Sequence, residues 1–205
     1  PICIDDIVLI CNGEIYNYKE IYSKNNISPS TNSDCEAIIH CYKLYGIDYT
    51  LQLLDGVFAF ILVDKTKNKI YASRDPYGVR PMHYFKIENT WVFGSELKQV
   101  HDFYKENSTI KQFPPSHYFE FSFNNNTWSF NKSQQYITNF IQPIKFANFE
   151  NIITNIQYYL IQAVVKRIHT SERPIACLLS GGLDGSLITS IVSKYYDGKL
   201  KTFSI

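Results

Sequence analysis

Apolar and polar positions alternate in short runs over the first part of the chain, a spacing that is typical of β-strands. Three stretches each hold two such runs around a polar turn, which predicts hairpins at 57–75, 82–96 and 117–130. Another apolar run ends in Asn12-Gly13 and predicts a strand that enters a turn at this dipeptide. The pattern therefore predicts a strand-rich region from residue 1 to about residue 130.

The stretch 33–46 has a helical spacing in place of the alternation. Its apolar side chains recur on one face of a helix, at positions 35, 38, 39, 42 and 45. Ser33, followed three residues later by Glu36, is typical of a capping box, and Gly46 is typical of a helix end. A capped helix among paired strands predicts a mixed α+β domain.

The pattern changes after about residue 130, where a polar stretch without a clear period predicts a linker. Residues 150–170 then repeat apolar positions at helical spacing, and a strand at 175–180, a small-residue loop, a helix and a strand at 200–205 follow. This order is typical of the start of a parallel α/β sheet, and one such unit cannot close a domain. We therefore expect a second domain that continues beyond this chain. The predicted first domain, linker and second domain cover 1–135, 136–149 and 150–205.

Composition and charge exclude several function classes. The 205 residues are 45% hydrophobic and carry a net charge of +1, which offers no electrostatic case for nucleic acid or an anionic membrane. No apolar run approaches the roughly 18 residues that span a bilayer, and no secretory signal opens the sequence. The five cysteines form no CxxC pair, which favours buried thiols in a reducing compartment and therefore a cytoplasmic location.

The sequence SGGLDGS at 180–186 joins a predicted strand to a predicted helix. Glycines let the backbone approach oxygen atoms closely, and the N–H groups at a helix N-terminus bind anions. Ser180 and Ser186 add hydroxyl donors, whereas Asp184 repels phosphate unless it holds Mg²⁺ between itself and the phosphates. The alternative is an ordinary helix start that is capped by serine and aspartate.

The sequence NGEIYN at 12–17 is a second candidate site. The Asn12 side chain and the Gly13 backbone can direct two N–H donors at one point, as an acyl-transfer oxyanion requires. Glu14 and Asp34 can each hold an ammonium group. The alternatives are a hairpin turn at Asn-Gly and an aspartate that favours a helix N-terminus, and each alternative is favoured when its residue is taken singly.

The order of these motifs resembles that of the glutamine-hydrolysing asparagine synthetases. The motifs that carry the resemblance are NGEIYN, SDCEAIIHCYKLYG, LDGVFAFILVD, SRDPYGVRP, GSELK, FPPSHY and LLSGGLDGS. RDPYGVRP is also similar to the glutaminase domain of phosphoribosylpyrophosphate amidotransferases, but the SGGLDGS loop excludes that enzyme. SGGLDGS resembles the pyrophosphate-binding loop SGGxDS[ST] of ATP pyrophosphatases, with Gly185 where that family usually has serine.

The resemblance implies an N-terminal-nucleophile glutaminase domain, which is an αββα sandwich, followed by the start of an ATP pyrophosphatase-type synthetase domain with a parallel α/β sheet. The first domain would release ammonia from glutamine. The second would use aspartate, ATP and Mg²⁺ to form β-aspartyl-AMP, which ammonia converts to asparagine. The implied partners are thus glutamine, aspartate and ATP, and a homodimer remains open.

The resemblance also implies roles for individual residues. Asn12 and Gly13 match the oxyanion hole, and Glu14 and Asp34 match residues that hold the α-amino group of glutamine. Residues matched to the adenine nucleotide and its pyrophosphate are Leu178, Leu179, Ser180, Gly181, Gly182, Asp184, Gly185 and Ser186, with Asp184 also matched to Mg²⁺. Residues expected to serve the structure of the glutaminase core are Arg74, Asp75, Arg80 and Glu96.

The nucleophile of that family is an N-terminal cysteine, and we expect it and the later synthetase segments to lie outside this chain. Cys3 and Cys11 are expected to be buried and inert. We therefore expect the 205-residue chain alone to be inactive, and Gly185 to weaken ATP binding without abolishing it. The alternatives are a truncated non-catalytic relative with residual glutamine or nucleotide binding, and a β-lactam-synthetase-like ligase.

Overall fold

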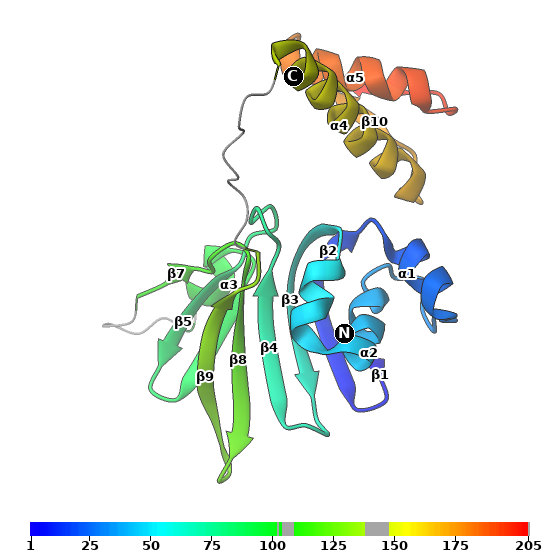
Figure 1. Cartoon of the computed structure of the whole chain (residues 1–205). Coiled ribbons are helices and arrows are strands. Elements are labelled where there is room, and N and C mark those ends of the chain that lie inside the picture. The colour runs from blue at the N-terminus through cyan, green and yellow to red at the C-terminus, as the bar shows by residue number, and fades with distance from the viewer. Residues whose placement is uncertain (102, 104–108, 138–147, 205) are drawn as a thin grey trace. The chain divides into compact units, whose positions relative to one another are not determined.

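The chain divides into two units of structure, which cover residues 1–140 and 141–205. The computed structural model describes residues 1–101, 103, 109–137 and 148–204 (Figure 1). Most of the predicted linker at 136–149 lies outside the described residues.

Antiparallel strands form a six-stranded sheet in the first unit. In spatial order the strands are β1 (Ile2–Ile4), β2 (Ile7–Ile15), β3 (Gly56–Asp64), β4 (Lys69–Arg74), β8 (His117–Asn124) and β9 (Thr127–Gln135). The β3–β4 and β8–β9 hairpins confirm two of the three predicted strand pairs. Asn125 and Asn126 form the turn of the second hairpin with φ angles of 51° and 58°, as a type I′ turn requires.

A three-stranded antiparallel sheet packs on one face of the larger sheet. Its order is β6 (Thr90–Gly94), β5 (His83–Ile87) and β7 (Lys111–Gln112), and the β5–β6 pair confirms the third predicted hairpin. The short helix α3 (Leu97–His101) contacts β5 and β6. The buried residues between the two sheets are Ala59, Ala72, Met82, Phe113, Phe119 and Phe121.

Two helices, α1 (Tyr18–Asn25) and α2 (Glu36–Leu53), cover the opposite face of the six-stranded sheet. Side chains alternate along a strand, so β3 contributes to the cores on both faces of the sheet. Phe58, Phe60 and Leu62 pack with the helices, whereas Ala59 packs toward the second sheet. This helix-sheet-sheet layering agrees with the predicted mixed α+β domain. The sequence patterns did not predict α1.

Helix α2 differs from its prediction at both ends. Gly46 adopts φ 76° and ψ 175°, but it kinks the helix and does not end it, because Ile47 and Leu51 continue the buried apolar face. The predicted capping box does not form. Only the backbone oxygen of Ser33 accepts from the Glu36 N–H (3.1 Å), and the Glu36 side chain turns away to residues 30 and 31.

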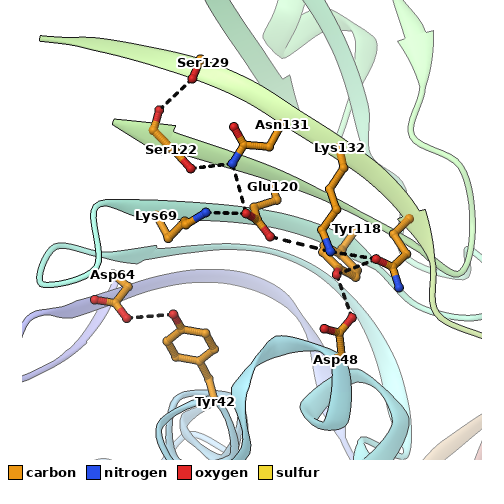
Figure 2. A network of polar contacts seen from close by, with 11 residues as sticks. Tyr42, Asp48, Asp64, Lys69, Tyr118, Glu120, Ser122, Ser129, Asn131 and Lys132 are labelled. Carbon is orange, nitrogen blue, oxygen red and sulfur yellow. Dashed lines mark hydrogen bonds and ion pairs between the residues drawn. The ribbon is translucent and has the colours of Figure 1, made fainter. Parts of the chain in front are cut away.

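Side-chain hydrogen bonds attach α2 to the sheet (Figure 2). The Tyr42 hydroxyl donates to Asp64 Oδ2 on β3 (2.8 Å), and the Tyr118 hydroxyl on β8 donates to Asp48 Oδ1 on α2 (2.7 Å). Burial, with these carboxylate partners, raises the pKa of both tyrosines, so both stay protonated donors at neutral pH. The bonds hold α2, and with it the segment that precedes its first turn, against the strands.

The dipeptide Asn12-Gly13 lies inside strand β2 and is not a turn, contrary to the prediction from its sequence. Asn12 pairs with Ala59 and Gly13 with Phe58, and the chain turns only after Ile15. Pairing along the whole of β3 outweighs the local turn preference of Asn-Gly. Glycine has a packing role here, because a Cβ at position 13 would lie 2.5 Å from Val57 O and 2.8 Å from Phe58 Cα.

Gly13→Ala is therefore expected to destabilise the first unit by about 1–3 kcal/mol, as overpacking does. The measurement is urea unfolding followed by tryptophan fluorescence. Asn12→Ala, at the next position of the same strand, is the matched control, because its exposed side chain has room to shorten. Equal stabilities of the two variants would contradict the close contact.

The second unit contains α4 (Phe149–Thr170), β10 (Ala176–Leu178), α5 (Leu183–Tyr195) and β11 (Lys201–Phe203). Strands β10 and β11 pair in parallel, with α5 as their crossover, which confirms the predicted parallel α/β start. The small core consists of Val164, Cys177, Ile191 and Val192. Among the described residues, no helix combines the length and apolarity needed to span a bilayer.

Candidate functional site

One edge of β2 is open beside Gly13. Strand β1 pairs with β2 only as far as Leu9, so no described strand lies beside residues 10–15 on that side. The Tyr16 N–H donates to Asp55 O (2.7 Å), in line with β3, and peptide groups alternate in direction along a strand. The peptide groups of Gly13 and Ile15 therefore point toward the open edge.

The segment before α2 meets this open edge. Asp34 Oδ2 accepts from the Ile15 N–H (2.5 Å), and the Cys35 thiol donates to Gly13 O (3.7 Å). The peptide that donates to Asp34 joins Glu14 to Ile15. Asp34, which comes from the segment before α2, is thus held against the backbone of β2 beside Glu14.

The side chains of Asn12 and Glu14 lie on the face of β2 that is turned to the second sheet. Asn12 Nδ2 donates to Ser95 Oγ (3.4 Å), and Arg80 Nη2 lies 3.2 Å from Glu14 Oε1. A cavity of about 130 Å³ lies beside Asn12, lined also by Cys11, Met82, Phe93 and Ser95 among others. The structure therefore brings the four predicted residues of this site together and adds Arg80 and Ser95, which sequence reasoning did not assign to it.

Arg80 reaches Glu14 because two buried residues shape the RDPYGVRP segment. The Asp75 carboxylate accepts from the backbone N–H groups of Phe58, Tyr77, Val79 and Arg80 at 2.9–3.3 Å. Arg74 donates to the backbone oxygens of Gly78, Arg80 and Phe113 at 2.5–2.7 Å. Burial lowers the pKa of Arg74, and the charge of Asp75 opposes that shift. The expected structural role is confirmed for Arg74 and Asp75, whereas Arg80 also contacts a predicted site residue.

Glu96 lies outside these contacts. Its carboxylate forms an ion pair with Lys98 on the surface, and its N–H donates to Gln99 Oε1 (3.1 Å). The neighbouring Ser95 is the residue of the GSELK motif that contacts Asn12.

Cys11, which lies beside the cavity, is a poor nucleophile. Hydrogen bonding to Cys35, together with burial, raises the pKa of the Cys11 thiol far above its ordinary value, so Cys11 carries no thiolate at neutral pH. Cys3 is exposed, contrary to the prediction that it is buried. The reason is its place on the edge strand β1, where its side chain points away from the apolar cluster that Ile2 and Ile4 contact.

The SGGLDGS loop forms the predicted connection between β10 and α5. Gly181 has a φ of 85°, which favours glycine, and Gly182 is the N-cap of α5. Because the N-cap residue has no side chain, it cannot cap the N–H groups of the first turn. Ser180, Asp184 and Ser186 are exposed around these groups. The exposed Leu178 precedes the loop, and the Leu179 N–H donates to Phe203 O (2.8 Å).

The loop is suited to phosphate, and its donor set fits a substrate-bound Mg²⁺ ion. No group of three or more His, Cys, Asp or Glu side chains gathers anywhere in the described part of the chain. Mg²⁺ at nucleotide sites needs only one or two carboxylates, because waters and the phosphates supply the remaining ligands. Asp184, in the first turn of α5, offers one such carboxylate.

Comparison with known proteins identifies two sequence families in the chain. Residues 3–158 match the family model of the glutamine amidotransferase domain, and residues 155–205 match that of asparagine synthase. A probable glutamine-hydrolysing asparagine synthetase of Acanthamoeba polyphaga mimivirus is 37% identical, over 90% of this chain and 36% of its own length. The Dictyostelium discoideum relative is 36% identical over 96% of this chain, and Arabidopsis thaliana asparagine synthetase 1 is 35% identical over 94%. These matches confirm the resemblance that the motifs indicated, and the chain spans about a third of the length of these relatives.

Solved structures confirm the fold. The glutamine phosphoribosylpyrophosphate amidotransferase from B. subtilis, complexed with ADP and GMP, matches with a TM-score of 0.53 and 16% identity. The match covers 97% of this chain and 45% of that one. A second structure, of the allosteric regulatory enzyme of purine biosynthesis, gives a TM-score of 0.54 at the same identity. These likenesses support the predicted N-terminal-nucleophile glutaminase fold.

Proposed function

Because this chain belongs to the glutamine amidotransferase domain family, we propose that it is part of a glutamine-hydrolysing asparagine synthetase. The observation that carries the proposal is the bond from the Ile15 N–H to the Asp34 carboxylate at the open edge of β2, which places Asp34 against the strand residues that follow Gly13. The carboxylates of Glu14 and Asp34 suit the ammonium group of an amino acid, and the N–H donors of Asn12 and Gly13 suit its side-chain amide. The same contacts favour a working glutamine site over a β-lactam-synthetase-like ligase.

In the glutaminase half, Glu14 and Asp34 hold the α-ammonium group of glutamine. Arg80 pairs with Glu14, so the incoming ammonium group competes with Arg80 for that carboxylate. The Asn12 side-chain amide and the Gly13 N–H donate to the oxygen that becomes negative when the glutamine amide is attacked. The products of hydrolysis are glutamate and ammonia. Cys11 is not the attacking thiolate, because its raised pKa keeps it protonated at neutral pH. Cys3, on the edge strand β1, is not the attacking thiolate either.

In the synthetase half, the loop from Ser180 to Ser186 binds the pyrophosphate part of ATP, and the backbone at Leu178 or Leu179 contacts the adenine nucleotide. The aspartate β-carboxylate attacks the α-phosphorus of ATP and expels pyrophosphate. Ammonia then attacks the acyl carbon of β-aspartyl-AMP, and AMP leaves. Mg²⁺, when bound, neutralises phosphate charge, and Asp184 is the residue that would hold it. The free cysteines suit a cytoplasmic location.

The proposal is tested on the whole protein that contains this chain. It should form asparagine, AMP and pyrophosphate from aspartate and ATP, with either glutamine or ammonia as the nitrogen source. Synthesis from ammonia but not from glutamine would support the proposed synthetase activity and contradict the proposed glutaminase activity. Binding of ATP or glutamine without synthesis would favour the truncated, non-catalytic relative.

Gly185→Ser is expected to tighten ATP binding. Gly185 lies in the first turn of α5, and a Cβ there would meet Leu178 O at 3.4 Å, so a serine side chain has room. A hydrogen bond from a hydroxyl to a charged phosphate is worth about 1.5–3 kcal/mol, which corresponds to a roughly 10- to 150-fold lower Kd. The measurement is calorimetric titration with ATP and Mg²⁺, with Gly185→Ala as the control without a hydroxyl. Equal affinities of the wild type and Gly185→Ser would contradict the proposed phosphate contact.

A further inference from the structure

Asp34 lies on a segment that has no regular structure of its own. Residues 26–35 form neither helix nor strand, and residues 28–32 are exposed. The bond from Ile15 N–H joins the Asp34 carboxylate to the sheet. A carboxylate that binds ligand from such a segment needs further contacts to hold its position, because a ligand site works only in a narrow geometry.

Glu36, at the start of α2, supplies hydrogen bonds that hold this segment. Its side chain is fully buried, and its two oxygens accept from Ser30 N–H (2.7 Å), Thr31 N–H (2.6 Å) and the Thr31 hydroxyl (2.6 Å). His40 Nε2 lies 2.9 Å from Glu36 Oε1. Burial raises the pKa of Glu36, but hydrogen bonds from Thr31, Ser30 and His40 outweigh it and leave the pKa below its ordinary value. The acceptor is therefore a charged carboxylate, and its hydrogen bonds are of the stronger, charge-assisted kind.

These bonds close the segment around Asp34. Thr31 and Glu36 are joined by their side chains, and the backbone adds Glu36 N–H to Ser33 O and Ala37 N–H to Asp34 O, both at 3.1 Å. Asp34 lies between Thr31 and Glu36, which these bonds join, so they also fix the direction of its carboxylate. Loss of the Glu36 charge would release Ser30 and Thr31 and leave Asp34 with fewer fixed neighbours.

We propose that Glu36 is a positioning residue for the glutamine site, which acts by holding the Ser30–Thr31 backbone so that Asp34 stays at the edge of β2. Its buried side chain does not touch the ligand, and its whole effect passes through Asp34. The inference rests on the proposed function, because it takes Asp34 as a holder of the α-ammonium group.

The test measures KM for glutamine and kcat in asparagine synthesis by the whole protein. In Glu36→Gln an amide N–H₂ replaces one acceptor oxygen and faces the donors, so KM for glutamine should rise about 10- to 150-fold, with kcat much less affected. Synthesis from ammonia should stay within about twofold of wild type, because it does not use this site. Thr31→Val removes one neutral hydroxyl donor and should raise the same KM about 2- to 10-fold. Glu20→Gln, which removes an exposed carboxylate paired with Lys24, is the matched control and should change nothing.

A double variant separates positioning from general destabilisation. If Glu36 acts through Asp34, adding Glu36→Gln to the Asp34→Asn variant should raise KM no further, whereas independent effects would multiply. An unchanged KM in both Glu36→Gln and Thr31→Val, or multiplying effects in the double variant, would overturn the inference. If Glu36→Gln does not fold, Thr31→Val decides alone. A wild-type protein that makes asparagine from ammonia but not from glutamine would instead overturn the proposed function, and the inference with it.

Discussion

Asn12→Ala in the whole protein is expected to lower glutamine-dependent asparagine synthesis about 100- to 1000-fold, the usual cost of one lost oxyanion donor. The Asn12 side chain is exposed at the edge of a cavity, and among the described residues its amide donates only to Ser95 Oγ (3.4 Å), so the fold does not depend on it. Ammonia-dependent synthesis should be unchanged, because free ammonia bypasses the glutaminase half. The measurement is the rate of asparagine formation with each nitrogen source.

Asn89→Ala provides the matched control for this prediction. Asn89 is exposed in the turn between β5 and β6, at the opposite end of β6 from Ser95, and its truncation should leave both rates at the wild-type level. Equal losses with glutamine and ammonia in Asn12→Ala would indicate a folding defect. An unchanged glutamine-dependent rate would contradict the proposed role of Asn12 in the oxyanion hole.

Asp75→Asn is expected to lower the free energy of unfolding of the first unit by about 3–5 kcal/mol, as the loss of one member of a buried charged network does. The Asp75 side chain is fully buried and accepts from four backbone N–H groups. An asparagine there would turn an N–H₂ group toward two of these donors. The neighbouring Arg74 guanidinium would then lie beside a neutral group. The measurement is urea unfolding, with the midpoint and the slope reported separately.

Asp6→Asn is the matched control for Asp75→Asn. Asp6 is exposed in the turn before β2, where its carboxylate accepts from the Thr66 hydroxyl (3.2 Å). Surface substitutions of this kind usually change stability by less than about 0.5 kcal/mol. Similar losses in the two variants would mean that the hydrogen bonds of Asp75 contribute little.

The sequence predicted the hairpins and the phosphate-type loop because their signals are local. Asn125 and Asn126 suit a two-residue turn, and Gly181 supplies the positive φ that the loop between β10 and α5 needs. Both features depend on residues that are adjacent in the chain, so a pattern of a few positions is enough to find them.

The errors arose where partners outside the local motif compete with its own preference. Asn12-Gly13 has the composition of a turn, but pairing with β3 keeps it extended. Glu36 has the spacing of a capping box, but the donors of Ser30 and Thr31 attract its carboxylate instead.

Residues of the candidate site were missed when their partner lies far along the chain. Arg80 is 66 residues from Glu14, and Ser95 is 83 residues from Asn12. Neither pairing follows from spacing, since it depends on the register of β2 with β3 and on how the RDPYGVRP segment folds around Asp75. Arginine in that motif was a signal, but only the fold shows which carboxylate it meets.

The proposed function is that of an enzyme in which a glutaminase half supplies ammonia to a synthetase half. The most direct measurement supplies the whole protein with aspartate, ATP and glutamine that is labelled with ¹⁵N in its amide, in the presence of unlabelled ammonia. We expect ¹⁵N in the side-chain amide of the product asparagine at a higher enrichment than in the free ammonia pool. Asparagine with no label, or no asparagine at all, would contradict it.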